Sequence, residues 1–437
     1  MRRRAFLAAG LAGLAGCSAL PVGSEEVTDP AEWGYDIAVE HDADDWAKLD
    51  PDWRAPSDVP DTDVSAETVI KELEIPWDLS FAPNGDLFVS ERTGTLLRYE
   101  AGTVESVASP SDIVDASAID VGDEGGWWST GGEGGLMGTA VHPSYPEVPL
   151  VYAVYTYTEN GGARNKLVCY DVSADDPPVA TLIEGLPGGS YHNGSRLTFG
   201  PADYLWMTTG DAGDAALAAD PDSLAGKVLR LEPDGSAAEP NPDVGDPRVY
   251  TYGHRNPQGI TFLPDATPVE IEHGPGAYDE VNVLDAGGNY GWGPEDERAR
   301  NADTYPGSDY HRPVVNTYPG STWAPSGGVF YTGDAVPSWE NRVVVSGLRS
   351  QRLNVVTLYP SDGEPVDVGE GRRYDADWMN EKYDAVHHTA LEDELGRIRH
   401  AEQGPDGALY AITSNRDGRA DEFPVAGDDR LVRIVPE

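Results

Sequence analysis

The feature that most constrains the fold of this chain is a turn-and-strand pattern that occurs three times. Each copy begins at the end of an apolar run, passes through a turn that contains Pro with Asn, Asp or Gly, and ends in a second run with an aromatic residue. The copies are residues 81–90, 199–208 and 403–412. A hairpin that recurs so far apart is typical of a β-propeller, because one blade is a small sheet that cannot bury its face alone.

The rest of the chain also favours strands, and no long stretch has the 3.6-residue apolar period of a helix. Short runs rich in β-branched and aromatic residues are separated by turn residues, which include 50 Gly and 35 Pro. The clearest runs are 87–89, 148–157, 205–209, 343–345 and 353–358. We therefore predict an all-β chain. Roughly 370 residues would make six blades of about 60 residues, seven or eight blades of ordinary size, or a pair of β-sandwiches.

The net charge argues against nucleic acid as a partner and suggests a solvent of high salt concentration. The chain has 76 Asp and Glu against 30 Lys and Arg, for a net charge of −46 and no basic stripe, so nucleic-acid binding is not expected. Only 5 of the basic residues are Lys. A lysine-poor polyanion suits molar salt, where the Debye length is about 3 Å and like charges repel little. We predict a halophilic protein, with an acidic protein of ordinary ionic strength as the alternative.

The N-terminus reads as an export signal, predicted over residues 1–16. Arg2, Arg3 and Arg4 are followed by Phe6 and Leu7, as in twin-arginine signals, and the apolar run that follows is too short to span a bilayer. The run ends in Leu-Ala-Gly before Cys17, which resembles a lipobox. We expect lipidation of Cys17 and a location on the outer face of the cell membrane. A plain cleaved signal is the alternative.

An acidic spacer is predicted over residues 17–66, ahead of a propeller over 67–437. The stretch is rich in Asp, Glu and Pro and buries too little apolar surface to fold alone, so we expect it to be largely disordered. Its three tryptophans, Trp33, Trp46 and Trp53, could pin parts of it to the domain.

Polar, glycine-rich loops carry the candidate chemistry, and a propeller would gather them at one end of its channel. They are residues 127–138, 191–196, 209–213, 252–259, 272–275, 287–292, 322–327 and 396–399. His192 could take a proton from a hydroxyl group, and Asp211 could orient its imidazole. Arg255 and Asn256 suit an anionic ligand or a developing negative charge.

Other cofactor signatures are few. The sequence has no His-x-x-x-His or His/Cys pairing typical of zinc, no phosphate-binding Gly-rich loop with Lys, and no dinucleotide fingerprint. Asp279 and Glu280, beside glycine-rich turns, could supply oxygen ligands to a hard cation such as calcium.

The ordered motifs resemble those of one family. His-Asn-Gly-x-Arg, Gly-Asp-x-Gly, Gly-His-Arg-Asn-Pro-Gln-Gly, Glu-His-Gly-Pro, Gly-Asn-Tyr-Gly-Trp and Ala-Pro-Ser-Gly, in that order, are similar to the soluble PQQ-dependent glucose, aldose and sorbosone-type sugar dehydrogenases. The resemblance covers roughly residues 70–437. It implies a six-bladed propeller that holds pyrroloquinoline quinone (PQQ) and calcium. It also implies oxidation of the anomeric C1 hydroxyl of an aldose to a lactone, with electrons passed to an external acceptor.

The resemblance also implies roles for single residues. His192 matches the general base, Asp211 an acid beside it, and Arg255 and Asn256 the groups that hold the quinone and stabilise its reduced form. The carbonyls of Gly274 and Pro275 match ligands of the cofactor-associated calcium, and Glu280 with the backbone of Tyr290 matches a second calcium site. The other residues expected at the cofactor are Glu133, Thr322, Arg349, Arg397 and Arg399.

Three departures from the family pattern stand out. Glu133 replaces a usual Gln, which would set a carboxylate against an anionic quinone unless it is protonated or paired. Arg349 replaces a usual Lys, and Ala215-Ala216 stands where a polar residue is expected on the substrate side. These departures keep two alternatives open: a binding propeller without chemistry, for carbohydrate or a cell surface, and a calcium-dependent lactonase.

Overall fold

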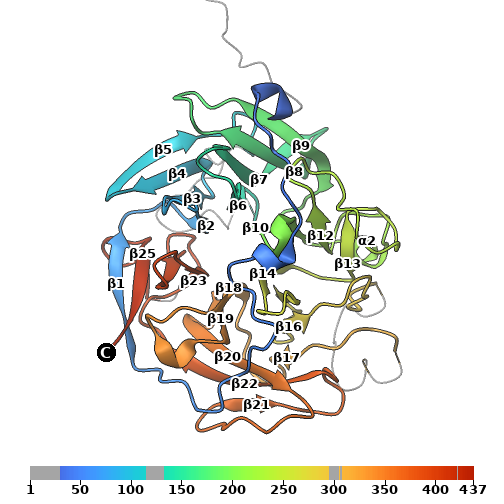
Figure 1. Ribbon diagram of the computed structural model, residues 1–437, viewed down its shortest axis with the longest axis vertical. Coiled ribbons are helices and arrows are strands. Elements are labelled where there is room, and N and C mark those ends of the chain that lie inside the picture. The colour runs from blue at the N-terminus through green and yellow to red at the C-terminus, as the bar shows by residue number, and fades with distance from the viewer. Residues whose placement is uncertain (1–29, 115–131, 295–304, 306–307, 421) are drawn as a thin grey trace, which may run out of the picture.

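The computed structural model describes residues 30–114, 132–294, 305, 308–420 and 422–437. Within these ranges the strands form six antiparallel sheets arranged around a central channel (Figure 1). The chain is thus an all-β, six-bladed propeller, as the resemblance implied, and the sandwich alternative is wrong. The expected signal, Cys17 and residues 127–131 of the first glycine-rich loop lie outside the described residues.

The blades follow one another along the chain. Blades 1 and 2 are β2 (Pro76–Phe81), β3 (Leu87–Glu91), β4 (Thr95–Glu100), β5 (Thr103–Ala108), and β6 (Leu136–Val141), β7 (Leu150–Glu159), β8 (Gly162–Asp171), β9 (Val179–Pro187). Blades 3 and 4 are β10 (Gly194–Phe199), β11 (Leu205–Thr209), β12 (Lys227–Leu231), β13 (Val249–Tyr252), and β14 (Pro257–Phe262), β15 (Pro268–Glu272), β16 (Glu280–Val283), β17 (Val315–Asn316).

Blade 5 has a fifth strand. It contains β18 (Pro325–Tyr331), β19 (Arg342–Gly347), β20 (Arg352–Pro360), β22 (Tyr383–Ala390) and β21 (Arg372–Tyr374). Blade 6 contains β23 (Ile398–Gln403), β24 (Leu409–Thr413), β25 (Leu431–Pro436) and β1 (Val64–Ile70). The short helices are η1 (Pro30–Trp33), η2 (Ala43–Asp45), η4 (Pro201–Asp203), α2 (Ala215–Ala219) and η5 (Pro337–Trp339). No helix among the described residues is long and apolar enough to cross a membrane.

The two ends of the propeller chain meet in blade 6. β1 pairs antiparallel with β25, with Val64 opposite Pro436, so the first strand completes the sheet made by the last three. This closure leaves the ring without an open seam between the first and last blades. It also places the start of the propeller at Val64, three residues before the predicted boundary at 67.

The three hairpins seen in the sequence occupy equivalent places. They join the innermost strand to the second strand in blade 1 (β2 to β3), blade 3 (β10 to β11) and blade 6 (β23 to β24). The interpretation of the repeat as a blade hairpin is confirmed. The turn lies at the same end of each of these blades, because the chain forms the innermost strand first and then turns into the second strand.

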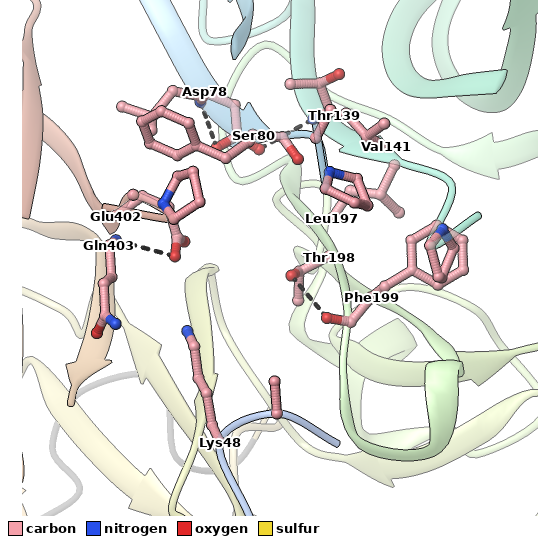
Figure 2. A pocket seen from close by; sticks show the side chains of 18 of the residues that line it. Lys48, Asp78, Ser80, Thr139, Val141, Leu197, Thr198, Phe199, Glu402 and Gln403 are labelled. Carbon is pink, nitrogen blue, oxygen red and sulfur yellow. Dashed lines mark hydrogen bonds between the residues drawn. The ribbon is translucent and has the colours of Figure 1, made fainter. Parts of the chain in front are cut away.

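The innermost strands β2, β6, β10, β14, β18 and β23 contact one another in sequence around the channel. We call the end of the channel where these strands begin the upper end, and the end where they finish the lower end. Residues at the finish of the strands, among them Phe81, Val141, Phe199 and Gln403, line a cavity at the lower end (Figure 2). Several of the candidate active-site loops precede these strands, and residues 209–213 and 272–275 follow the second strands of blades 3 and 4, which run back to the same end, so these loops lie at the upper end.

Residues 30–63, which we call the strap, differ from the expected disordered spacer. They run over the ring from blade 2 to β1, in dark blue in Figure 1. The Tyr35 hydroxyl donates to Asp171 of blade 2 at 3.2 Å, and His41 stacks on Tyr204 of blade 3 at 3.9 Å. Aromatic contacts and backbone hydrogen bonds therefore hold an acidic segment that has little apolar surface of its own.

The tryptophans of the strap account for much of this attachment. Trp46 meets Phe262 of blade 4 edge-on at 6.2 Å, and Trp53 meets Phe330 of blade 5 at 5.3 Å. Trp33 packs, partly buried, against the core of blades 2 and 3. The expectation that the tryptophans pin the acidic stretch is confirmed for its described part.

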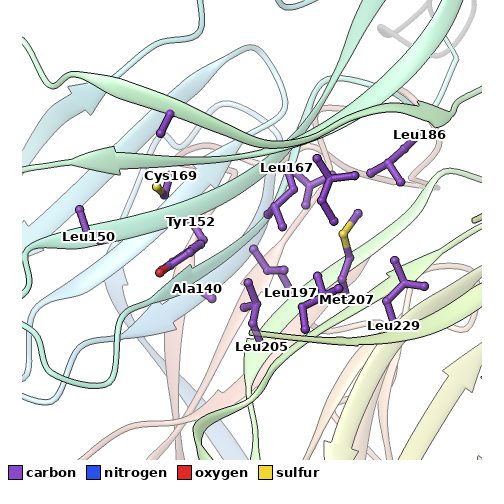
Figure 3. Packing of buried hydrophobic residues seen from close by; sticks show 14 of the residues in the cluster. Ala140, Leu150, Tyr152, Leu167, Cys169, Leu186, Leu197, Leu205, Met207 and Leu229 are labelled. Atoms are coloured by element: carbon purple, nitrogen blue, oxygen red, sulfur yellow. The ribbon is translucent and has the colours of Figure 1, made fainter. Parts of the chain in front are cut away.

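The hydrophobic core lies between neighbouring blades. Figure 3 shows one such layer, in which Leu150, Tyr152 and Leu167 of blade 2 face Leu205 and Met207 of blade 3. Alternation along each strand supplies these apolar faces. Cys169 lies in the same layer as a free, fully buried thiol, and burial raises the pKa of this thiol, which keeps it protonated.

Candidate active site at the upper end of the channel

The upper end brings His192 and Asp211 into direct contact. Nδ1 of His192 lies 2.8 Å from Oδ1 of Asp211, and the imidazole is 13% exposed while the carboxylate is buried. An ionised Asp accepts, so Nδ1 carries the proton and Nε2 is left with a lone pair. Nε2 has no hydrogen-bond partner among the described residues. The pair is therefore arranged to accept a proton from a ligand in the channel.

The local chain explains how these two residues meet. His192 has a left-handed backbone, with φ of +59°, in the turn before β10, and Asp211 follows β11, the neighbouring strand. Gly210 lets the two turns touch, since a Cβ atom there would collide with the carbonyl of His192. Such strained, close-packed backbone is common at functional sites.

Asp211 is held by further donors. The indole Nε1 of Trp292 donates to its Oδ2 at 2.7 Å, and the backbone N–H of Gly213 donates to Oδ1 at 2.7 Å. Ala215 and Ala218 of α2 pack against Trp292. The Ala215-Ala216 departure thus supports the indole that fixes Asp211, which gives one of these small residues a packing role.

Glu133 is paired, which answers the question raised by its replacement of Gln. Its Oε2 accepts from the backbone N–H of His192 at 3.0 Å, and its Oε1 lies 3.9 Å from the guanidinium of Arg419. The carboxylate therefore steadies the turn that carries His192, and a cation offsets part of its charge.

Arg255 and Asn256 lie beside the His192 pair. The carbonyl of Arg255 accepts from the N–H of Asp211 at 2.8 Å, and its guanidinium lies over the ring of Trp292 at 5.4 Å. Asn256 Oδ1 accepts from the N–H of Gly194, two residues after His192, at 3.1 Å. The structure thus places the two residues next to the expected base.

A cavity of about 450 Å³ adjoins this cluster. Glu133 is the only acid among its described lining residues. It faces Thr322, Arg349, Arg397, Arg399, Arg92, Arg419 and His273. In a chain of net charge −46, five arginines around one cavity indicate an anionic ligand. Every cofactor-contact residue predicted from the sequence, apart from Arg255 and Asn256, lines this cavity.

The arginines are not equivalent. Arg397 forms an ion pair with Asp417, with Nη2 2.9 Å from Oδ2. Arg399 donates through Nη1 to Gln258 Oε1 and Ser326 Oγ, but its buried Nε and Nη2 have no hydrogen-bond partner among the described residues. Burial lowers the pKa of Arg399 to about 9, and Arg397 adds to the shift against the opposing effect of Asp417. An anion at these two N–H groups would relieve that cost.

His273, which also lines this cavity, likewise indicates an anionic ligand. Its Nε2 is buried and has no partner among the described residues, while burial, followed by Arg255 and Arg399, holds its pKa well below the usual range. The indole of Trp77 adds a flat surface to the lining. Free N–H groups, several cations and an aromatic face fit a planar polycarboxylate, which is the chemistry of PQQ.

The predicted calcium ligands are arranged less compactly. The carbonyl of Gly274 accepts from Nη1 of Arg255 at 3.3 Å, and Pro275 follows it in the same loop. Glu280 is buried at the start of β16, where Oε1 accepts from Tyr305 at 2.8 Å and Asn316 at 3.0 Å. Tyr290 is buried in the next loop, and its hydroxyl donates to Val283 O. Their oxygens suit calcium.

A different group has metal-like spacing. His254, Glu270 and Glu272 are fully buried beneath Arg255, with ligand atoms within 4.8 Å of one another. The N–H of Arg255 donates to Oε2 of Glu272 at 2.7 Å, so at least one of these carboxylates supports the arginine. The sequence reasoning did not assign these three residues.

Sequence reasoning also missed Trp77, Arg92, His273, Trp292 and Arg419. His273 and Trp292 lie in glycine-rich loops of the candidate site, but the sequence pattern indicates a role only for neighbouring residues such as Gly274 and Tyr290. Arg92 and Arg419 follow β3 and β24 in segments without any notable motif. Only the convergence of the blades shows that they share a cavity with Arg399.

Comparisons with known proteins agree with this geometry. An aldose sugar dehydrogenase of Escherichia coli is 28% identical over 84% of this chain and 93% of its own length. Quinoprotein glucose dehydrogenase B of Acinetobacter calcoaceticus is 32% identical over 52% of each chain. The PQQ-bound aldose sugar dehydrogenase of Streptomyces coelicolor superposes with a TM-score of 0.66 at 32% identity, over 86% of this chain and 99% of its own.

The sequence pattern that defines the glucose/sorbosone dehydrogenases matches residues 73–423, which include blades 1 to 5, the strands β23 and β24 of blade 6, and every residue of the candidate site. Together with the propeller and the arginine-lined cavity, this match shows that the chain belongs to the glucose/sorbosone dehydrogenase family.

Proposed function

We propose that this protein oxidises the anomeric C1 hydroxyl of an aldose to the lactone, with PQQ as the bound oxidant and an external acceptor for the electrons. The observation that carries the proposal is the pairing of an available His192 Nε2 with an adjoining arginine cavity whose buried N–H groups lack partners. The first suits a hydroxyl proton, and the second suits a polyanionic cofactor.

The cofactor would be held by the cavity residues. Arg399 and His273 offer free N–H groups, while Arg349, Arg92 and Arg419 add positive charge. When bound, PQQ would supply the acceptor for two electrons. The PQQ-bound relative from Streptomyces coelicolor supports this assignment.

Calcium would be bound by oxygens near the cofactor. We assign one ion to the carbonyls of Gly274 and Pro275, and a second to Glu280 and the backbone of Tyr290. Hard carbonyl and carboxylate oxygens are the ligands that calcium prefers. Near the cofactor the ion would act as a Lewis acid.

His192 would act as the general base. Asp211 accepts the Nδ1 proton and so fixes the tautomer, while Trp292 and Gly213 keep Asp211 in place. The anomeric hydroxyl would give its proton to Nε2, which raises the electron density on C1 and favours loss of the C1 hydrogen with its electron pair.

Arg255 and Asn256 would complete the reacting centre. The guanidinium of Arg255 is a fixed cation beside His192, and Asn256 holds the turn that follows the base. A cation positioned before the reaction stabilises negative charge without reorganisation. Glu133 keeps the His192 turn in its left-handed conformation.

Two alternatives make different predictions. A calcium-dependent lactonase would act without a quinone, and a carbohydrate-binding or cell-surface propeller would show no turnover. The departures that supported the binding propeller lose weight, because Glu133 is paired and Ala215 packs under the indole that holds Asp211.

Reconstitution tests the proposal. The protein would be loaded with PQQ and Ca²⁺ in molar salt, and dye reduction would be followed on a panel of aldoses. We expect turnover that requires PQQ and is lost in His192→Ala. Lactone hydrolysis without PQQ would favour the lactonase, and PQQ-loaded protein without turnover on any aldose would contradict the proposal.

We also propose that the protein is exported through the twin-arginine route, is anchored by lipid at Cys17 as its sole membrane contact, and works in high salt. The signal-like residues 1–16 and the net charge of −46 support this. Membrane fractionation of the wild type and Cys17→Ala, together with unfolding measured across salt concentrations, tests both parts.

A further inference from the structure

The lower end of the channel contains a second cavity, of about 520 Å³, that is separate from the active site. A layer of side chains divides the two. Arg196 donates to the carbonyls of Gln258 at 2.9 Å and Ser326 at 2.6 Å, pairs with Asp78, and lies over Trp77. Because this layer joins blades 1, 3, 4 and 5, the lower cavity cannot be an extension of the cofactor site.

Two opposite charges face each other across the lower cavity. Lys48 reaches in from the strap and Glu402 projects from β23, and the end of the Lys48 side chain is directed toward Glu402 in Figure 2. No hydrogen bond or ion pair within 4.0 Å joins them among the described residues, although the Lys48 ammonium is near enough to help lower the pKa of Glu402. Two charges held apart in a shared cavity leave room for a ligand that contacts both.

Among the other charged groups of the lining, Asp78 and Arg196 are engaged with each other, and Asp203 adds a further carboxylate. Asp78 pairs with Arg196 and accepts from the N–H of Thr139 at 2.9 Å. Glu402 accepts from the N–H of Gln403 at 3.0 Å and has His400 Nε2 at 3.6 Å, and its side chain is 26% exposed. Its carboxylate therefore has capacity for further donors.

The wall between the two charges combines hydroxyl groups with apolar surface. Ser80 and Thr198 come from inward positions of β2 and β10, and the apolar part is formed by Phe81, Val141 and Phe199. A ligand that fits must therefore carry a cation, an anion and an apolar group.

We propose that the lower cavity binds a free α-amino acid with an apolar side chain. The ammonium group would donate to Glu402, the carboxylate would accept from Lys48, and the side chain would cover the apolar wall. Opposite charges on one small molecule match the cavity better than a single charge, since either ion alone would leave one protein charge without a partner.

The binding test uses the full chain and ligands that differ by one group. Isothermal titration with L-leucine is compared with 4-methylpentanoate, which lacks the amine, and 3-methylbutan-1-amine, which lacks the carboxylate. We expect saturable binding of L-leucine and at least tenfold weaker binding of the other two. Glycine betaine, which has no N–H donor, should also bind more weakly.

Variants locate the site. Glu402→Gln and Lys48→Met should each weaken L-leucine binding at least tenfold, while Lys71→Met, which removes an exposed lysine elsewhere, should leave it unchanged. Circular dichroism and PQQ affinity check that the variants remain folded, and both are independent of the lower cavity. The proposal is overturned if wild type shows no saturable heat, as a water-filled cavity would, or if the two cavity variants bind like the control.

Discussion

The two ends of one channel, built from the same six innermost strands, have opposite chemistry. The upper cavity is lined by five arginines and one glutamate. The lower cavity is lined by Asp78, Asp203 and Glu402, with Arg196 bound to Asp78 and Lys48 supplied from outside the blades. The upper end is thus suited to an anionic ligand, whereas the lower end has acidic groups together with Lys48.

The difference follows from which part of each blade supplies the lining. Upper residues such as Glu133 and Arg397 come from loops that precede the inner strands, and a loop can aim any side chain at the axis. Lower residues such as Ser80 and Glu402 lie within strands, where only alternate positions face the channel. Residues that take part in catalysis can therefore be changed more easily at the upper end, where loops carry them.

The largest expected effect concerns the base at the upper end. His192→Ala should lower kcat by about 10²- to 10⁴-fold while PQQ affinity stays nearly unchanged, because the variant loses proton transfer and keeps the arginines. Dye reduction by the reconstituted protein measures kcat. His41→Ala, on the strap, is the matched control, and an equal loss there would remove the distinction between the two ends.

The dividing layer provides the second test, because Arg196 and Arg399 both lie near Trp77. Arg399→Met should weaken PQQ binding about 10- to 100-fold with little change in stability, since its free N–H groups face the cavity. Arg196→Met should instead lower the free energy of unfolding by about 3–5 kcal/mol, because the buried carboxylate of Asp78 would lose its arginine partner. PQQ titration and urea unfolding of both variants test these roles. Weaker PQQ binding by Arg196→Met together with a large loss of stability in Arg399→Met would contradict them.

A smaller effect is expected at Glu133. Glu133→Ala should lower kcat about 3- to 10-fold, because the N–H of His192 loses a partner worth about 1 kcal/mol. Glu133→Gln retains an acceptor and removes the negative charge, so it should keep kcat and bind PQQ somewhat more tightly. Stopped-flow reduction and PQQ titration separate the two effects. Identical behaviour of Ala and Gln would show that charge alone matters.

The smallest effect is expected at the lower end. Burial acts to raise the pKa of Glu402, but His400 and Lys48 outweigh it, so the net pKa is lowered. A lowered folded pKa stabilises the protein above the unfolded pKa, and that contribution disappears as pH falls through the folded value. Glu402→Gln should therefore cost about 1 kcal/mol or less at pH 7, and this cost should shrink as the pH falls through the folded-state pKa of Glu402. Urea unfolding at pH 7 and at lower pH tests this, with sugar oxidation unchanged at pH 7.

Much of the fold could be predicted from local pattern. The run 205–209 is β11 without adjustment, and the three repeated turns are blade hairpins, because alternation and turn residues act over a few positions. The acidic stretch was misjudged because its order depends on partners such as Phe262 and Phe330, which lie hundreds of residues away.

The candidate site was predictable where a motif marked it and not elsewhere. His192, Asp211 and Arg255 stand in glycine-rich loops whose order resembles the family, and the structure brings them together. Arg92 and Arg419 have no such signal. The ion pair of Arg397 with Asp417 has no sequence signal either, and neither do the unpartnered N–H groups of Arg399 among the described residues.

The sequence by itself determined the strand content, the blade hairpins, the motif order and the excess of negative charge, because each is a property of neighbouring residues. Only the tertiary structure decided that residues from several blades form one arginine-lined cavity, that Glu133 pairs with the His192 turn, and that the strap brings Lys48 opposite Glu402. These are contacts between segments distant in the chain, and they exist only once the ring of blades is closed.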